Sequence, residues 1–146
     1  MIVPASTNQE KSALVTYLSG KIGLAPVDLV GCSPFEIVGV VRGGDLMGAV
    51  LYTRWREKSI EMACAGEPGW LTPAALKDLF AYPFQRLGAY TVLSIVVRRN
   101  DRARKFNERL GFKHLGVIES GASKGEDSII YSMTRPQCRW LEERIH

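Results

Sequence analysis

The chain has few of the residues that bind metals or form disulfide bonds. Its 146 residues include only three cysteines and two histidines. Cys32, Cys64 and Cys138 are odd in number and widely spaced, and no Cys-x-x-Cys pair occurs. This pattern favours free thiols in a reducing compartment. His114 and His146 add too little for a zinc-binding set, so we expect no metal site.

Long apolar runs are also lacking. No run approaches the roughly 20 residues that a membrane-spanning helix needs. The opening segment, MIVPASTNQE, lacks the basic and apolar regions of a signal peptide. With 46% hydrophobic and 23% charged residues, the composition is typical of a globular protein, and the length suits one core. We therefore expect a single domain over residues 1–146, located in the cytoplasm, with no membrane partner.

Acidic residues are scarce in one segment. The formal net charge is +4, and the basic excess is concentrated in residues 98–113. Clustered arginine favours a phosphate-bearing partner, either a nucleotide-like ligand or nucleic acid. The alternative is a solvated helix face. Against Asp101 and Glu108, the basic residues of the segment are Arg98, Arg99, Arg102, Arg104, Lys105, Arg109 and Lys113.

The hydrophobic pattern predicts three helices, which span residues 8–19, 73–87 and 101–110. Thr7 and Glu10 form a capping box before the first helix. Thr72 is a favoured N-cap for the second, and Pro83 within that helix should introduce a kink. Residues 20–34 are rich in glycine and proline, so we expect a loop there with at most one helical turn.

Runs of β-branched and aromatic residues predict strands over 35–41, 46–54, 58–65, 91–97, 112–118 and 128–133. The first three should form an antiparallel meander, because Gly43-Gly44-Asp45 is a good hairpin turn. Residues 121–127 are expected to form a polar loop. The third and fourth strands should be joined by a parallel crossover through helix 73–87. The expected fold class is therefore α+β, with helices packed on a mixed sheet.

Residues 100–112 read N-x-x-A-x-x-F-x-x-x-L-G-F, behind an apolar strand and ahead of two more strands. This motif and the order of elements resemble the GNAT N-acetyltransferase superfamily over roughly residues 36–133. The resemblance implies a twisted mixed sheet of about six to seven strands with helices on both faces. It also implies acetyl-coenzyme A (acetyl-CoA) as co-substrate and transfer of its acetyl group to a primary amine. Strands 58–65 and 91–97 would splay apart and hold the cofactor between them.

By this resemblance, the pyrophosphate would bind backbone N–H groups of the loop that precedes helix 73–87, where the helix dipole favours anions. The sequence departs from the family pattern Q/R-x-x-G-x-G/A, because Glu67 adds negative charge and Pro68 and Pro73 each remove a donor. Variant loops of this kind occur in the branches that acylate protein N-termini or ribosomal proteins, and the chain looks closer to those. The implied loop residues are Gly66, Gly69, Trp70, Leu71 and Thr72.

The basic helix would supply the remaining cofactor contacts. Asn100 could bond the pantetheine amide, or serve as a helix N-cap, or do both. Arg102 and Arg104 could bind the adenosine 3′-phosphate or the pyrophosphate through their planar guanidinium groups, or remain surface charge. Phe106 could touch the pantetheine arm, although its spacing from Ala103 more simply predicts a core position.

Asn107 stands where many members of the family carry a tyrosine that protonates the leaving thiolate. An amide is not an acid near neutral pH. Either another group then donates the proton or the coenzyme A thiolate leaves unassisted, which its thiol pKa of about 8–9 allows. Tyr131, on the last predicted strand, is a second candidate acid.

Two residues are candidate catalytic groups. Glu61 could take a proton from an ammonium acceptor, aided by an apolar setting that raises its pKa, or it could face solvent. Ser94 interrupts the apolar run TVLSIVV and could bond the acetyl group, a water or a neighbouring backbone group. The strand from Met62 to Cys64 would contact the cofactor and offer a backbone N–H to the tetrahedral oxyanion. Without a nearby histidine, Cys64 is interpreted as a small buried thiol.

Other interpretations stay open. A non-catalytic acyl-CoA-binding or regulatory protein on the same fold is favoured by Asn107 and the variant loop. A nucleic-acid or protein-interaction module using helix 101–110 is the least favoured, because no aromatic-interleaved RNA motif or zinc pattern occurs. The sequence does not identify the acceptor, which could be the amine of a small molecule or of a protein. Residues 136–146, with a helical turn expected over 139–145, could pack on the domain or bind a second copy in a homodimer.

Overall fold

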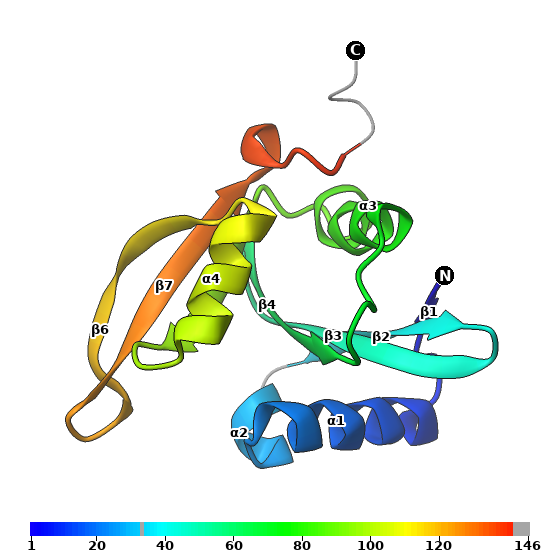
Figure 1. The fold of residues 1–146 in the computed structure, drawn as a ribbon, viewed down its shortest axis with the longest axis horizontal. Helices are drawn as coiled ribbons and strands as arrows, with labels where there is room; N and C mark the ends of the chain where they lie inside the picture. Colours follow the sequence, from blue (N-terminus) through cyan, green and yellow to red (C-terminus); the bar gives the residue numbers. More distant parts are fainter. Residues whose placement is uncertain (33, 142–146) are drawn as a thin grey trace.

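A computed structural model describes residues 1–32 and 34–141 of the chain. A seven-stranded sheet has the order β1-β2-β3-β4-β5-β7-β6. Helices α1 and α2 cover one face, and α3 and α4 cover the other (Figure 1). The predicted α+β class and the mixed sheet with helices on both faces are therefore confirmed. None of the helices in the described ranges is long and apolar enough to cross a membrane.

The elements follow the predicted order, with additions. The strands are β1 (Ile2–Pro4), β2 (Phe35–Arg42), β3 (Asp45–Arg56), β4 (Ser59–Gly66), β5 (Thr91–Val97), β6 (Lys113–Ser123) and β7 (Glu126–Thr134). The helices are α1 (Asn8–Ile22), α2 (Pro26–Val30), α3 (Pro73–Ala81) and α4 (Asp101–Leu110), with a π-helical turn η1 (Tyr82–Arg86) and a 3-10 turn η2 (Arg135–Gln137).

The first helix begins as predicted and ends later. The Thr7–Glu10 capping box is present, and α1 runs on to Ile22 before Gly23 caps it in the left-handed region at φ 87°. The loop expected over 20–34 is wrong at its start, because residues 20–22 belong to α1, whereas the short α2 over Pro26–Val30 fits the single helical turn that was allowed there. Proline suits the first turn of a helix, and the burial of Leu29 holds this short helix against the sheet.

The β6–β7 hairpin is longer than predicted. The polar loop expected over 121–127 is wrong, because β6 continues to Ser123 and β7 begins at Glu126. Almost all of β6 is exposed, so its sequence lacks the alternation that marks a half-buried strand. The pairing also shifts between Ile118 and Ser123. The short β1, which pairs with β2, has too few residues to give a pattern and was not predicted.

The helix expected over 73–87 is interrupted next to Pro83, where a kink was expected. The α-helix stops at Ala81, and the π-helical turn that contains Pro83 continues it to Arg86. Proline has no N–H to donate and disturbs the helical ladder. The turn closes when the N–H of Leu87 donates to the carbonyl of Tyr82 at 2.9 Å. This change of helix type lets Phe84 stay buried in the core.

The C-terminal segment packs on the domain as far as it is described. Cys138 and Leu141 are buried in the main core. The Trp140 indole N–H donates to the carbonyl of Leu110 at 2.8 Å, at the end of α4. The helical turn expected over 139–145 lies largely outside the described residues.

Candidate functional site

The two central strands separate after three paired residues. β4 and β5 run parallel and pair at Ser59–Thr91, Ile60–Val92 and Glu61–Leu93, and both strands continue beyond that point. β5 keeps its antiparallel pairing with β7 from Thr91 to Val97, so it diverges from β4 together with β7. The predicted splaying of these strands is therefore confirmed. Within residues 1–32 and 34–141, one edge of β4 therefore has no strand partner from Met62 to Gly66.

The side chains of β4 beyond Glu61 alternate between the two faces of the sheet. Met62 and Cys64 point toward the α3 core, whereas Ala63 and Ala65 pack toward α1. Burial raises the pKa of the Cys64 thiol to about 12. The thiol is therefore protonated near neutral pH and is not a nucleophile.

Glu61 lies at the point where the strands part, on the face covered by α1 and α2. Its side chain is 14% exposed, and its carboxylate is 3.2 Å from the Arg54 guanidinium. Arg54 in turn donates to the carbonyls of Asp28 and Leu29 in α2, at 3.4 Å each. The setting is therefore neither the apolar pocket nor the solvent face considered from sequence. Arg54 has a positive φ of 54° at an irregularity of the β3–β4 pairing, which brings its side chain over α2.

Ser94 and Asn107 form a buried pair. The Asn107 side-chain N–H donates to Ser94 Oγ at 3.0 Å. Ser94 is 9% exposed and Asn107 5% exposed, so both are removed from solvent where α4 crosses β5. The Ser94 hydroxyl is thus engaged by a side chain, a partner that the sequence did not indicate.

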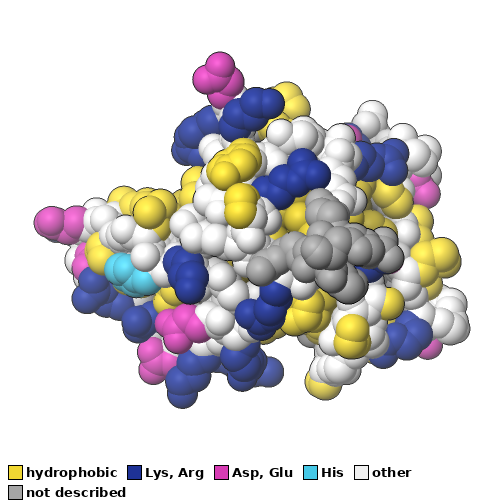
Figure 2. All heavy atoms as spheres, turned by 90° about the horizontal axis from the view of Figure 1, so that it is seen from above, with side chains coloured by type: hydrophobic (Ala, Val, Ile, Leu, Met, Phe, Trp, Pro, Cys, Tyr) yellow, Lys and Arg dark blue, Asp and Glu magenta, His cyan; other side chains and the backbone are white. Residues whose placement is uncertain are grey.

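Basic residues of the segment 98–113 do not form one continuous surface. Figure 2 shows one face of the molecule, on which dark blue Lys and Arg side chains lie in separate groups with a few magenta Asp and Glu side chains among them. Arg98 lies 3.7 Å from Asp127, and Arg99 lies 2.5 Å from Glu126. The side chain of Arg102 is exposed and makes no hydrogen bond or ion pair within the described part of the chain. It is therefore free to meet a phosphate.

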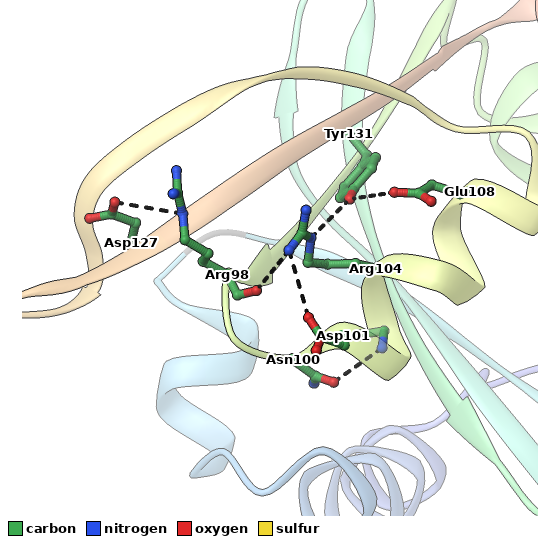
Figure 3. Close-up of polar contacts among 8 residues, drawn as sticks. Arg98, Asn100, Asp101, Arg104, Glu108, Asp127 and Tyr131 are labelled. Carbon is green, nitrogen blue, oxygen red and sulfur yellow. Dashed lines mark hydrogen bonds and ion pairs between the residues drawn. The ribbon is translucent and has the colours of Figure 1, made fainter.

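Arg104 is turned toward β7 (Figure 3). Its guanidinium donates to the hydroxyl of Tyr131 at 3.4 Å and to the carbonyl of Arg98 at 3.2 Å. The Tyr131 hydroxyl donates to Glu108 at 3.2 Å, and the tyrosine side chain is 1% exposed. These contacts give Arg104 and Tyr131 structural partners within α4, β7 and the turn before α4.

α4 and its N-cap carry two residues that were predicted to contact the cofactor, Asn100 and Phe106. Asn100 Oδ1 accepts from the N–H of Ala103 at 3.1 Å, so Asn100 is the N-cap (Figure 3). The cap uses the oxygen of the amide, and its N–H₂ group donates to none of the described residues. Phe106 is partly buried and packs against the main core.

The β4–α3 loop is shaped by Trp70. The indole is 7% exposed and lies against the backbone of two glycines that pair across β3 and β4, Gly48 and Gly66. A Cβ atom at Gly48 would lie 2.3 Å from Trp70 Cε3, and one at Gly66 would lie 2.5 Å from Trp70 Cδ2. Arg42 donates to the carbonyls of Gly69 and Trp70 at 3.1 and 3.0 Å. Sequence reasoning missed Gly48 and Arg42, although the paired glycines are a signal of close approach.

Several N–H groups of this loop remain open. The N–H of Glu67 donates to Met47, and that of Trp70 donates to Glu67. Thr72 is the N-cap as predicted, and its hydroxyl accepts from the N–H of Ala75 at 3.1 Å. By contrast, the described residues offer no acceptor to the N–H groups of Gly69, Leu71 and Ala74. Unpaired donors at a helix N-terminus favour an anion.

The sequence matches no protein-family model and no curated protein. Its structure, in contrast, is similar to many solved ones. One is a protein assigned to the GNAT acetyltransferase family from Desulfovibrio desulfuricans, with a TM-score of 0.69 and 18% identity over 92% of this chain and 98% of that chain. A variant of the spermidine N-acetyltransferase SpeG from Vibrio cholerae gives a TM-score of 0.72 and 14% identity, covering 97% and 99%.

A third similar structure is assigned as a phosphinothricin N-acetyltransferase, with a TM-score of 0.65 and 13% identity over 92% and 98% of the two chains. At these identities the similarity shows the fold. The chain therefore has the fold of the GNAT acetyltransferases, and its closeness to the N-terminal or ribosomal-protein branch stays a prediction.

Proposed function

We propose that this chain transfers an acetyl group from acetyl-CoA to a primary amine. The observation that carries the proposal is the separation of β4 from β5 after Glu61 and Leu93, together with the open N–H groups of the β4–α3 loop and the first turn of α3. An unpaired strand edge can bond the amides of an extended ligand. Pantetheine is an extended chain with two amides, and pyrophosphate is an anion, so the two features fit the two halves of coenzyme A.

The residues around the gap suggest how the cofactor would be held. Pantetheine would bond the free edge of β4 between Met62 and Gly66. The pyrophosphate would meet the N–H groups of Gly69, Leu71 and Ala74. The side-chain N–H₂ of Asn100 would serve a pantetheine carbonyl, and Arg102 would pair with a phosphate.

In this mechanism a neutral amine attacks the thioester carbonyl directly. The protonated Cys64 gives no support to an acyl-cysteine intermediate. A backbone N–H between Met62 and Cys64 would stabilise the oxyanion, and positioning would supply most of the rate. Glu61 would accept the proton of the amine, with Arg54 holding the carboxylate. The thiolate would leave without a tyrosine acid.

The acceptor is proposed only as an amine, of a small molecule or of a protein. The similar structures include proteins named for spermidine and phosphinothricin, and their sequences are too distant to transfer either substrate. The second candidate is a non-catalytic acyl-CoA-binding protein. It is favoured by the buried Ser94–Asn107 pair, which occupies the α4 position of the family's acid. In either case we propose a cytoplasmic location.

Calorimetric titration with acetyl-CoA tests the binding step, and release of free thiol with a panel of amines tests turnover. We expect a Kd in the micromolar range and thiol release with at least one amine class. Binding without turnover would select the non-catalytic candidate. No binding, with salt-sensitive binding of a polyanion instead, would reject both and favour a nucleic-acid module.

Two variants sharpen the titration. Arg102→Ala removes an exposed guanidinium without described partners, so it should weaken cofactor binding at an unchanged melting temperature. Arg104→Ala breaks the contacts with Tyr131 and Arg98, so it should lower the melting temperature. Equal effects of both variants on binding and on melting would contradict these assignments.

A further inference from the structure

The carboxylate of Glu67, the first residue of the β4–α3 loop, is held by two side chains of α1. The Tyr17 hydroxyl donates to Glu67 Oε2 at 2.5 Å, and Lys21 Nζ lies 2.7 Å from the same oxygen. Tyr17 and Lys21 are four residues apart, so both project from one face of α1. Because α1 covers the face of the sheet opposite α3, these contacts join the two faces around the end of β4 (Figure 1).

Glu67 brings the wrong charge to a loop that would receive phosphates. Its carboxylate stands two residues before Gly69, whose N–H is open. Hydrogen bonds from Lys21 and then from Tyr17 lower the pKa of the carboxyl, so Glu67 is ionised near neutral pH. An uncompensated negative charge there would repel a pyrophosphate.

The loop does not depend on this carboxylate for its shape. Trp70 fills the space over Gly48 and Gly66, and Arg42 holds two loop carbonyls. The N–H of Glu67 is fixed by the carbonyl of Met47 at 2.7 Å. Losing Lys21 should therefore change the charge beside the open N–H groups more than the path of the backbone.

We propose that Lys21 is a positioning residue for the phosphate loop. It neutralises Glu67 and holds that carboxylate toward α1, so that the loop can accept the pyrophosphate of an acyl-CoA. The inference rests on the proposed function. It adds to the cofactor site a cation, Lys21, that belongs to the helix on the opposite face of the sheet.

The charge role can be separated from a mechanical one. A mechanical link between α1 and the loop needs both residues, so removing either one should weaken binding equally. Charge compensation needs Lys21 only while Glu67 is negative. The variant Glu67→Gln removes the charge and keeps an oxygen that can accept from Tyr17.

The experiment is titration of coenzyme A into the wild-type chain, Lys21→Met, Glu67→Gln and the double variant. We expect Lys21→Met to raise the Kd about fivefold at low salt, and less at high salt, because the pair is partly exposed. Glu67→Gln should bind at least as tightly as wild type, and the double variant should regain most of the affinity lost in Lys21→Met.

Lys11→Met is the matched control. Lys11 also lies on α1 and also pairs with a glutamate, Glu36, at 3.8 Å with similar exposure, but it faces the start of β2. It should leave the Kd unchanged. Pantetheine, which lacks the pyrophosphate, should bind the wild type and Lys21→Met with equal affinity.

Equal losses in Lys21→Met and Glu67→Gln, with no recovery in the double variant, would overturn the inference in favour of a mechanical link. An unchanged Kd in Lys21→Met would overturn it altogether. Failure of the proposed function has a different signature, because the wild type itself would then not bind coenzyme A. Melting temperatures measured beside the titrations show that each variant is folded.

Discussion

The side-chain N–H of Asn107 donates to Ser94 Oγ at 3.0 Å, within the buried contact between α4 and β5. Asn107 stands at the position of α4 where the resemblance implies a tyrosine that acts as a general acid. The amide cannot serve as that acid, and its hydrogen bond to Ser94 gives it a structural role. In the proposed mechanism, no residue of α4 therefore protonates the leaving thiolate.

This pair should be coupled in stability. Ser94→Ala and Asn107→Leu each leave one buried polar group without its partner, and each should cost about 1–3 kcal/mol of unfolding free energy. The double variant should lose less than the sum of the two, because it leaves neither group orphaned. Urea denaturation of the four proteins measures the coupling. Strict additivity would show that the hydrogen bond contributes nothing.

Glu61 is the group whose loss should reduce the rate most. If it accepts the amine proton, Glu61→Gln should lower kcat/KM about 100-fold or more, with a small change in the Kd of acetyl-CoA. Arg54→Met keeps the carboxylate but removes the side chain that holds it, so kcat/KM should fall by less than in Glu61→Gln. Thiol release with a panel of amines measures both effects. An active Glu61→Gln enzyme would assign the Glu61–Arg54 pair to structure alone.

The cysteines should differ in reactivity. Cys32 is exposed, whereas Cys138 is buried and the Cys64 pKa is about 12. Alkylation of the native chain at pH 8 should therefore modify Cys32 alone, as peptide mass spectrometry would show. Cys64→Ala should retain thiol release, because no acyl-cysteine forms. Rapid labelling of Cys64, or loss of turnover in Cys64→Ala with the fold intact, would contradict direct attack.

Much of the fold was predictable because its signals are local. The Thr7–Glu10 capping box, the Thr72 cap and the break at Pro83 depend on residues within one turn of each other. The alternation in β4 and the apolar run of β5 marked the two strands that separate. These local patterns identified the two strands. The family resemblance then supplied the expectation that the strands separate.

Contacts between distant residues were not predictable. The packing of Trp70 on Gly48 and the ion pair between Lys21 and Glu67 each join segments more than 20 residues apart. The turn of Arg104 toward Tyr131 likewise depends on where β7 lies. A single sequence does not say which distant residue a side chain will meet, so Arg104 could be described only as a candidate phosphate ligand.

The paired glycines under Trp70 should not tolerate a side chain. Gly48→Ala would place Cβ 2.3 Å from the indole, so the ring and the β4–α3 loop must move. We expect a lower melting temperature, altered tryptophan fluorescence and weaker coenzyme A binding. Gly116→Ala in β6 is the control, because a Cβ there meets nothing within 4 Å. Equal behaviour of the two variants would contradict the role of Trp70.

The first helix should lose stability in acid through Glu10. Hydrogen bonds from Ser6 and Thr7 lower the Glu10 pKa from its ordinary value of 4.5. The carboxylate therefore stabilises the fold above pH 4.5, and this contribution is lost as the pH falls through the lowered folded-state pKa. Glu10→Gln should be less stable at pH 7 and lose less on acidification. Thermal melts against pH, with the exposed Glu119→Gln as control, check the sign.

Hydrogen–deuterium exchange with and without acetyl-CoA tests the central claim most directly, because it locates the ligand without knowledge of the acceptor. The account predicts slower exchange in residues 62–74 and at the start of α4, with little change in β6. Protection centred instead on the open hollow lined by Lys11, Val15 and Phe35, between α1 and the start of β2, or no protection at saturating ligand, would contradict it.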